Sequence, residues 1–390
     1  MCKYIKLIHK RIFIVIYCVP ERLFIAGIND KLDAFPQHTY NAGMSIEDRY
    51  KLNKEITLID IANELNVSKS TVSRALQNHH SIGAETTKAV HELAKKYHYQ
   101  PNAIAASLFK KSTKTIGVIV PILSHYFFST VIAGIEDVAY KAGYKVIICQ
   151  SHELYEREVI VSKTLLSAKV DGLIVSVSKE TVNMDHFQQF LDKNIPLIFF
   201  DRLPTGIQSN SVSVDDYEGA FKIVEHLIEQ GCKRIAHFTG PLNIALAQNR
   251  LQGYKDALRK HHIPVNDELI YECGFERTQG ITTTEKLLTD QVSVDAIFAV
   301  CDPVAIGVML TLKQKSIKIP HDIAVVGFND DPTATVIDPP LTTVAQPAFK
   351  IGVAAADIFL KQVIGPGRSY IKEVLKTNLT IRQSSLRKNR

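Results

Sequence analysis

The segment Val-Ser-Lys-Ser-Thr-Val-Ser-Arg, residues 67–74, constrains the fold of this chain more than any other. Apolar residues at helical spacing precede it and predict a first helix with one buried face: Leu58, Ile61, Ala62 and Leu65. Thr57, followed three residues later by Asp60, has the pattern of a capping box that begins this helix. Asn66 tolerates the positive φ of a tight turn, and Ser68 can cap a second helix. The pattern therefore predicts two helices joined by a tight turn.

The second helix of this pair is predicted to be polar and basic on its outward face. Its outward residues are Lys69, Ser70, Ser73 and Arg74, and its inward residues are Val72, Ala75 and Leu76. The turn spacing alone also fits an ordinary pair of surface helices. A third amphipathic helix over residues 84–97 favours a closed three-helix unit, which is the arrangement of a helix-turn-helix DNA-binding domain.

Basic residues are concentrated around this unit rather than spread evenly. The net charge of +6 is mild for a chain of 390 residues. The basic residues of the region are Lys69, Arg74, Lys88, Lys95, Lys96, Lys110, Lys111 and Lys114. The acidic residues between positions 56 and 115 are only Asp60, Glu64, Glu85 and Glu92. A local excess of positive charge is expected where a protein meets the phosphate backbone of DNA.

Three stretches of this region match one family. Residues 57–62 read Thr-Leu-Ile-Asp-Ile-Ala, residues 67–76 read Val-Ser-Lys-Ser-Thr-Val-Ser-Arg-Ala-Leu, and residues 99–105 read Tyr-Gln-Pro-Asn-Ala-Ile-Ala. The chain resembles the lactose-repressor (LacI/GalR) family of bacterial transcription factors over nearly everything after residue 55. The resemblance implies contacts with double-stranded operator DNA from Thr57, Leu58, Ser68, Lys69, Ser70, Thr71, Ser73, Arg74, Asn78, Tyr99, Asn102, Ala105 and Leu108.

Within this set, Lys69, Ser70 and Arg74 are expected to reach base edges in the major groove. The residues expected to position the helix on phosphates and sugars are Ser68, Thr71, Ser73 and Asn78. The hinge segment is too short for a helix that is stable alone in water, so we expect it to fold only on DNA. Leu108 matches the family's leucine wedge, which unstacks a central base step.

From residue 115 onward, short apolar segments alternate with amphipathic ones. Strands are predicted over residues 116–121, 145–149, 172–177, 197–200, 234–238, 296–300 and 323–327. Helices are predicted over residues 127–142, 157–168, 185–192, 217–230, 250–261, 278–288 and 303–315. This alternation predicts parallel sheets in two α/β lobes, with a cleft at the carboxyl ends of their strands. The resemblance implies a fold similar to periplasmic sugar-binding proteins, with crossings between the lobes near residues 214, 343 and 370.

The resemblance also implies an effector site in this cleft, formed by Phe128, Ser176, Asp201, Arg250, Phe275 and Asn329. Arg250 stands where the family has its ligand-binding arginine, near the predicted start of a helix. Asn329 replaces the family's usual aspartate, which removes a charged acceptor and puts affinity for a hydroxyl-rich sugar of the common type in question. The implied effector is a small molecule, either a sugar or a sugar derivative.

Residues 1–54 do not fit the family. Their basic start and short apolar run, residues 12–19, are similar to a signal peptide, but Pro20-Glu21-Arg22 interrupts the run before it reaches the length of a membrane span. Two interpretations remain: a start site assigned too early, with Met44 near the family's usual N-terminus, or a disordered extension. The six cysteines are scattered without a CxxC pair, which indicates buried thiols in a reducing cytoplasm.

The sequence thus predicts an α+β multidomain protein. Residues 55–100 are assigned to a three-helix helix-turn-helix headpiece, residues 101–114 to the hinge helix and linker, and residues 115–386 to a two-lobed α/β, periplasmic-binding-protein-like domain for effector binding and dimerisation. We expect a cytoplasmic homodimer that represses transcription at pseudo-palindromic operators. A C-terminal tail without an apolar heptad favours a dimer over a tetramer. No membrane, cofactor or metal is expected.

Two other classes of function compete with this interpretation. A small-molecule binding protein without a DNA function would have the two lobes, but it would have no use for the headpiece. An enzyme on a doubly wound fold would need a phosphate cradle or an activated nucleophile. The sequence has no GxGxxG or GxxxxGK[ST] after a predicted strand, and it has no GxSxG or HExxH. Whether the effector releases DNA binding or promotes it stays open at this stage.

Overall fold

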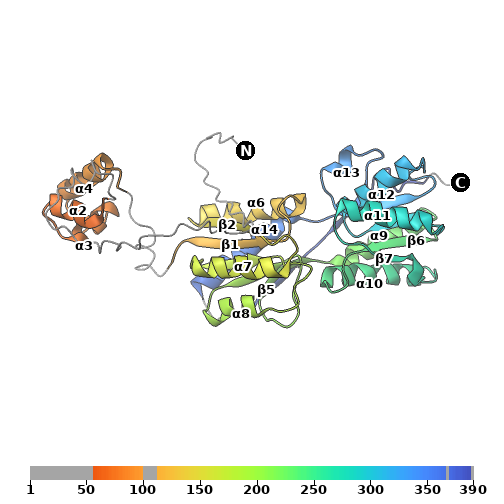
Figure 1. Cartoon of the computed structure of the whole chain (residues 1–390), viewed down its shortest axis with the longest axis horizontal. Helices are drawn as coiled ribbons and strands as arrows, with labels where there is room; N and C mark the ends of the chain where they lie inside the picture. Colours follow the sequence, from red (N-terminus) through yellow and green to blue (C-terminus); the bar gives the residue numbers. More distant parts are fainter. Residues whose placement is uncertain (1–55, 100–111, 366–368, 388–390) are drawn as a thin grey trace, which may run out of the picture. The chain divides into compact units, whose positions relative to one another are not determined.

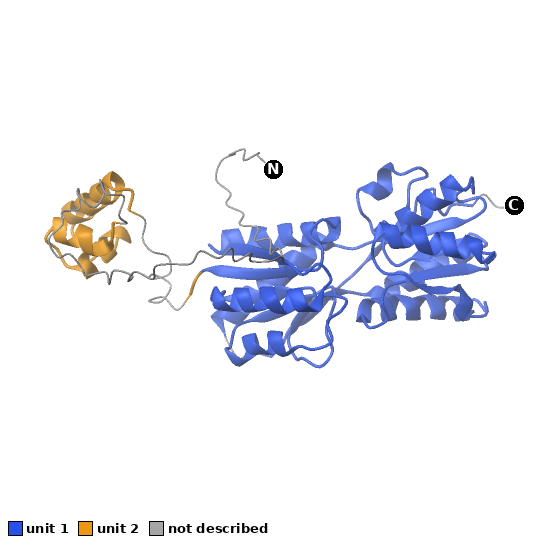
Figure 2. Cartoon of the chain, viewed as in Figure 1, with its two compact units in different colours: residues 1–18, 114–390 blue, residues 19–113 orange. Residues whose placement is uncertain are grey.

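In the computed structural model, the described residues are 56–99, 112–365 and 369–387 (Figure 1). They fall into two compact units, which Figure 2 colours orange and blue. The orange unit ends at Thr113, and the described part of the blue unit begins at Lys114. Within the described ranges, no helix is both long and apolar enough to cross a membrane.

Residues 56–99 form the headpiece, whose helices are α2 (Leu58–Glu64), α3 (Lys69–Leu76) and α4 (Ala84–Lys96). The capping box is present, because Asp60 N donates to Thr57 Oγ1 at 3.4 Å and Thr57 N donates to Asp60 Oδ2 at 2.8 Å. Asn66 has a φ of 50° in the turn, and Ser68 Oγ accepts a hydrogen bond from Thr71 N at 3.1 Å. The predicted starts of both helices and the turn between them are confirmed.

A small apolar core holds the headpiece together. Its buried residues are Ile61, Ala62, Val72, Ala75, Val90, Ala94 and Tyr97. From α3 only Val72 and Ala75 are fully buried. The periodicity of the sequence thus directs one face of α3 into the core and leaves the opposite face for solvent.

The first lobe of the larger unit is built on a sheet with the strand order β11-β5-β4-β3-β1-β2. Its strands are β1 (Thr115–Val120), β2 (Lys145–Gln150), β3 (Gly172–Val175), β4 (Leu197–Phe200), β5 (Asn210–Val214) and β11 (Lys372–Leu375). All these neighbours pair in parallel. One face is covered by α6 (Tyr126–Lys141) and α14 (Ala348–Ile364), and the other by α7 (Tyr155–Ser167) and α8 (Asp185–Asp192) (Figure 1).

The second lobe repeats this design with the strand order β12-β10-β9-β8-β6-β7. Its strands are β6 (Ile235–Thr239), β7 (Ile270–Glu272), β8 (Ala296–Ala299), β9 (Ala324–Asn329), β10 (Thr342–Ala345) and β12 (Asn378–Thr380). The pairing of β10 with β12 is antiparallel, and the others are parallel. Helices α9 (Asp216–Glu229) and α10 (Ala245–Lys260) cover one face, α11 (Arg277–Thr289) and α12 (Asp302–Gln314) cover the other, and the short α13 (Thr333–Val336) follows β9.

The two parallel-stranded lobes confirm the predicted fold class. The chain passes from the first lobe to the second between β5 and α9, returns between β10 and α14, and passes again between β11 and β12. The last passage follows Leu375, so the crossing expected near residue 370 lies a few residues later than predicted. The prediction missed β5, β7, β10, β11, β12, α13 and α14, and it placed the start of α10 too late.

Candidate functional site

The outward face of α3 presents positive charge to solvent. Lys69 and Arg74 are exposed, whereas Val72 and Ala75 on the opposite face are buried. Neither cation forms an ion pair with another residue of the described headpiece. Their charges are therefore available to an external anion, as the sequence predicted for this helix.

Hydroxyl groups gather at the N-terminus of α3. Ser68 Oγ lies 2.7 Å from Ser70 Oγ and 2.8 Å from Thr71 Oγ1, so the cap forms a small polar cluster beside Lys69. At the other end of the helix, Asn78 has a φ of 52°, and its amide oxygen lies 3.1 Å from His91 Nε2. A helix N-terminus with its hydroxyl groups at the surface is suited to contact phosphate oxygens.

The remaining predicted DNA contacts differ in exposure, and three of them lie outside the described residues. Thr57 is exposed at the cap of α2, whereas Leu58 and Tyr99 are partly buried against the headpiece core. Ser73 is half-buried on α3. The hinge predictions Asn102, Ala105 and Leu108 lie outside the described residues.

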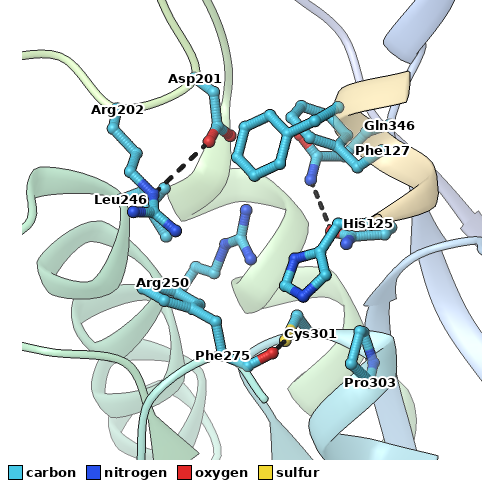
Figure 3. Close-up of a pocket in the computed structure, with 12 residues that line it drawn as sticks. His125, Phe127, Asp201, Arg202, Leu246, Arg250, Phe275, Cys301, Pro303 and Gln346 are labelled. Carbon is cyan, nitrogen blue, oxygen red and sulfur yellow. Dashed lines mark hydrogen bonds and ion pairs between the residues drawn. The ribbon is translucent and has the colours of Figure 1, made fainter. Parts of the chain in front are cut away.

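A pocket opens between the two lobes, and elements of both lobes line it (Figure 3). It contains about 390 Å³ of empty space, part of which is open solvent. The first lobe supplies His125, Phe127, Phe128, Asp201 and Arg202. The rest of the lining is Leu246, Arg250, Phe275, Cys301, Pro303, Asn329 and Gln346.

The structure brings together all the predicted effector residues except Ser176. Phe128, Asp201, Arg250, Phe275 and Asn329 line the pocket. Ser176 directly follows β3, is fully buried and does not belong to the lining; its Oγ has no hydrogen-bond partner among the described groups. The lining residues that the sequence analysis missed are His125, Phe127, Arg202, Leu246, Cys301, Pro303 and Gln346.

Arg250 lies in the middle of α10 rather than near the start of a helix, because α10 begins at Ala245. Its side chain is almost completely buried, with 2% exposure. Asp216 Oδ1 accepts from Arg250 Nε at 2.8 Å and from Nη2 at 2.6 Å, and the Val300 carbonyl accepts from Nη1 at 2.6 Å. The guanidinium also lies over the Phe328 ring, 3.6 Å from its centroid. These contacts fix its orientation beside the pocket.

Arg202 is the corresponding cation of the first lobe. Glu153 holds it in a bidentate pair, with Nη1 2.7 Å from Oε2 and Nη2 2.8 Å from Oε1. The guanidinium lies over the ring of Phe275, which belongs to the second lobe, at 4.5 Å from the centroid. Its Nε is buried and has no hydrogen-bond partner among the described groups, so one strong donor at the pocket is unused.

Asp201 is the acidic side chain of the pocket lining. Its Oδ2 lies 3.9 Å from Arg202 Nε, and its backbone has a positive φ of 61° (Figure 3). Burial raises the pKa of Asp201 to about 6, against the opposing attraction of the Arg202 and Arg250 guanidinium groups. The carboxylate therefore lacks the solvation that it would have in water. A hydrogen bond from a ligand hydroxyl group could replace that solvation.

Two neutral amides complete the polar lining. Gln346 Nε2 donates to Asn329 Oδ1 at 2.8 Å, and Gln346 Oε1 is buried without a partner among the described groups. Asn329 ends β9 with a φ of 135°. The pocket thus offers unused hydrogen-bonding groups of both kinds, donors and acceptors.

Polar contacts also join the two lobes directly. His125 Nε2 lies 3.2 Å from Glu276 Oε1, and Asn243 Nδ2 donates to the Lys179 carbonyl at 2.6 Å.

Cys301 lines the pocket, but burial raises the pKa of its thiol far above the usual range, so it stays protonated and is a weak nucleophile. The arrangement is suited to enclosing a ligand between polar groups and aromatic walls.

Comparisons with known proteins cover both parts of the chain. Residues 57–102 match the family described as bacterial regulatory proteins, lacI family, and residues 224–385 match a periplasmic binding protein-like domain. Catabolite control protein A of Priestia megaterium is 33% identical over 310 residues, which are 78% of this chain and 92% of that protein.

Two solved structures are similar to large parts of this chain. A lac repressor dimer bound to operator and the anti-inducer ONPF is 26% identical with a TM-score of 0.75, and the match covers 85% of this chain and 100% of that chain. A LacI family transcriptional regulator from Enterococcus faecium with bound ribose is 28% identical with a TM-score of 0.63, over 70% of this chain and 100% of that chain. The chain belongs to the LacI family of DNA-binding transcriptional regulators, which small-molecule effectors control.

Proposed function

We propose that this chain is a cytoplasmic repressor that binds a pseudo-palindromic operator as a homodimer and responds to a carbohydrate-like effector in the interlobe pocket. The proposal rests on one observation about α3: Lys69 and Arg74 are exposed on it, and its opposite face is buried. One headpiece buries too little surface to select a single site in a genome, so two are needed. The lac repressor dimer bound to operator, a relative in fold and sequence, supports this assembly.

The proposed roles of the headpiece residues are compatible with their positions on α3. Lys69, Ser70 and Arg74 are exposed on α3 and are assigned to base edges in the major groove. The hydroxyl cluster of Ser68 and Thr71 is assigned to phosphate oxygens. We assign residues 55–100 to the DNA-binding domain, residues 101–114 to the hinge, and residues 115–386 to the domain for effector binding and dimerisation.

The pocket is assigned a binding role and no catalytic one. Asp201 and Gln346 offer acceptors, Arg202 Nε offers a donor, and Phe128 and Phe275 offer aromatic walls. This combination of a few polar groups and an apolar wall is typical of sites for small polar ligands. The ribose-bound relative from Enterococcus faecium supports a carbohydrate-like effector.

Selection of bound fragments from a random DNA pool by the full-length protein tests the proposal. We expect enrichment of an inverted repeat, and we expect a sugar added to the binding reaction to change the amount of DNA retained. The Lys69→Ala/Arg74→Ala double variant is the matched control and should enrich no sequence. Enrichment of no inverted repeat by the wild-type protein would contradict the proposal.

A further inference from the structure

Both arginines of the pocket have their charge matched by a buried carboxylate. In the first lobe Arg202 pairs with Glu153, and in the second lobe Arg250 pairs with Asp216. Each pair is made within its own lobe, and each guanidinium borders the pocket. A ligand therefore meets arginines that are already neutralised, rather than unmatched positive charges.

Glu153 is well placed to stay ionised. It lies in the loop between β2 and α7 with a φ of 63° and an exposure of only 7%. Burial opposes its ionisation, but the Arg202 guanidinium and the Lys179 backbone N–H, which donates to Oε2 at 2.8 Å, outweigh burial and lower the pKa of this carboxyl. The two terminal nitrogens of Arg202 are bound to it, so the Nε side of the guanidinium is left for a ligand.

Carboxylates outnumber the guanidinium groups of the two pocket arginines in their immediate surroundings. Its two arginines, Arg202 and Arg250, face the carboxylates of Glu153, Asp216 and Asp201. Among the described groups, the pocket acceptor Gln346 Oε1 has no donor, and Asp201 Oδ2 lies 3.9 Å from Arg202 Nε, which is beyond hydrogen-bonding distance. Acceptors of this kind need a ligand that brings hydrogen-bond donors, and a carboxylate or phosphate group brings none when ionised.

We propose that the pocket selects an uncharged, hydroxyl-rich ligand over the carboxylate or phosphate derivative of the same ligand, and that Glu153 determines this preference. The inference rests on the proposed effector function and adds the charge of the effector and the residue that sets it. A hydroxyl group can accept from Arg202 Nε and donate to Asp201, whereas an anion meets repulsion from Asp201 and finds guanidinium groups whose charges are already matched by Glu153 and Asp216. Removing the charge of Glu153 leaves Arg202 with only the more distant Asp201 carboxylate, 3.9 Å from its Nε, and makes the pocket more favourable to anions.

Isothermal titration calorimetry of the full-length protein tests this with matched pairs of probes. The pairs are D-glucose with D-gluconate, D-galactose with D-galacturonate, and D-ribose with D-ribose 5-phosphate. We expect the wild-type protein to bind at least one neutral sugar at least tenfold more tightly than its anionic partner. Glu153→Gln should reduce this ratio at least tenfold, mainly by strengthening binding of the anion.

Glu158→Gln is the matched control, because Glu158 is a fully buried carboxylate of the same lobe that binds Ser178, Thr181 and His186 rather than a pocket arginine. It should leave the ratio unchanged. If Glu153→Gln fails to fold by circular dichroism, Glu153→Asp serves instead; it keeps the charge and should keep the neutral preference. The wild-type ratio tests the selectivity in either case.

The outcomes separate the inference from the function on which it rests. Tighter binding of an anion than of its neutral partner by the wild-type protein would overturn the inference and leave the effector function standing. An unchanged ratio in folded Glu153→Gln would overturn the role of Glu153. Binding of no probe, neutral or anionic, would contradict the proposed carbohydrate effector, and the inference would fall with it.

Discussion

The headpiece and the interlobe pocket use arginine in opposite ways. Arg74 is exposed on α3 and has no ionic partner in the described headpiece, whereas Arg202 and Arg250 are 3% and 2% exposed and each is bound to a carboxylate. A phosphate backbone is recognised through charge that is available to it. A buried pocket instead needs donors whose direction is fixed and whose charge is compensated. The comparison indicates that the headpiece supplies charge and the pocket supplies geometry.

The largest effect that distinguishes the two regions is expected for Arg250→Ala. Removing this side chain leaves Asp216 buried without its partner, which costs about 3–5 kcal/mol of unfolding free energy. The response to effector should be lost, since Arg250 borders the pocket. Urea unfolding of the full-length protein measures the first effect, and operator binding with and without a bound sugar measures the second.

A double variant isolates the cause of this loss. Replacing both partners, Arg250→Met with Asp216→Leu, removes the unmatched charge and should recover most of the stability without recovering the effector response. If Arg250→Ala unfolds at the same urea concentration as the wild-type protein, the pair does not support the lobe, and the contrast with the headpiece is wrong.

Arg74→Ala should have the opposite profile. Because Arg74 is exposed, its loss should change the unfolding free energy by less than about 0.5 kcal/mol. Specific operator binding should weaken by about 1–3 kcal/mol if the guanidinium reads a base edge. Fluorescence anisotropy with operator and with random DNA measures both affinities, and Lys95→Ala on α4 is the control for loss of a basic residue elsewhere. Equal losses on the two DNAs would show that Arg74 contacts only phosphates.

The sequence predicted the headpiece more completely than the pocket, for a physical reason. The cap at Ser68, the turn at Asn66 and the exposed Arg74 depend on neighbours only a few residues away, so local spacing specifies them. Arg202, by contrast, follows the predicted Asp201 directly, but its partner Glu153 is 49 residues distant in the sequence. A contact of that kind comes from the packing of parallel strands and leaves no periodic signal.

The missed elements have a similar origin. Helix α14 has eight buried residues, which include Ile351, Gly352 and Phe359, and its polar stripe is narrow, with Lys350, Asp357 and Lys361 as its exposed charged residues. Strands β11 and β12 are short, partly exposed edge strands. Gln346 follows β10, another strand that was not predicted. Because pocket residues were expected at the ends of strands, the sequence did not indicate that Gln346 lines the pocket.

The pocket should also respond to pH in a way that the headpiece does not. Burial raises the pKa of Asp201 to about 6, and its charged neighbours are Arg202, Arg250, Asp216 and Glu153. A neutral ligand whose hydroxyl group donates a hydrogen bond to Asp201 binds the protein in which Asp201 is ionised. Its affinity should therefore rise about tenfold from pH 5 to pH 7 and then level off. Asp201→Asn should remove this dependence in calorimetric titrations. An affinity that rises on acidification would mean that the ligand binds protonated Asp201.

The smallest expected effect tests whether the headpiece depends on local interactions as the comparison assumes. Thr57 caps α2 through a box in which Thr57 N and Oγ1 donate to Asp60 Oδ2 at 2.8 and 2.7 Å. Thr57→Ala removes the hydroxyl and should lower the stability of the headpiece by about 1 kcal/mol, whereas Thr57→Ser keeps the cap and should change it little. Hydrogen exchange of the full-length protein measures this region by region. Protection should fall about fivefold in α2, α3 and α4, which share one core, and should stay constant in the lobes. Equal loss of protection in the lobes would mean that the two units unfold together, and that the headpiece is not stabilised by its own contacts alone.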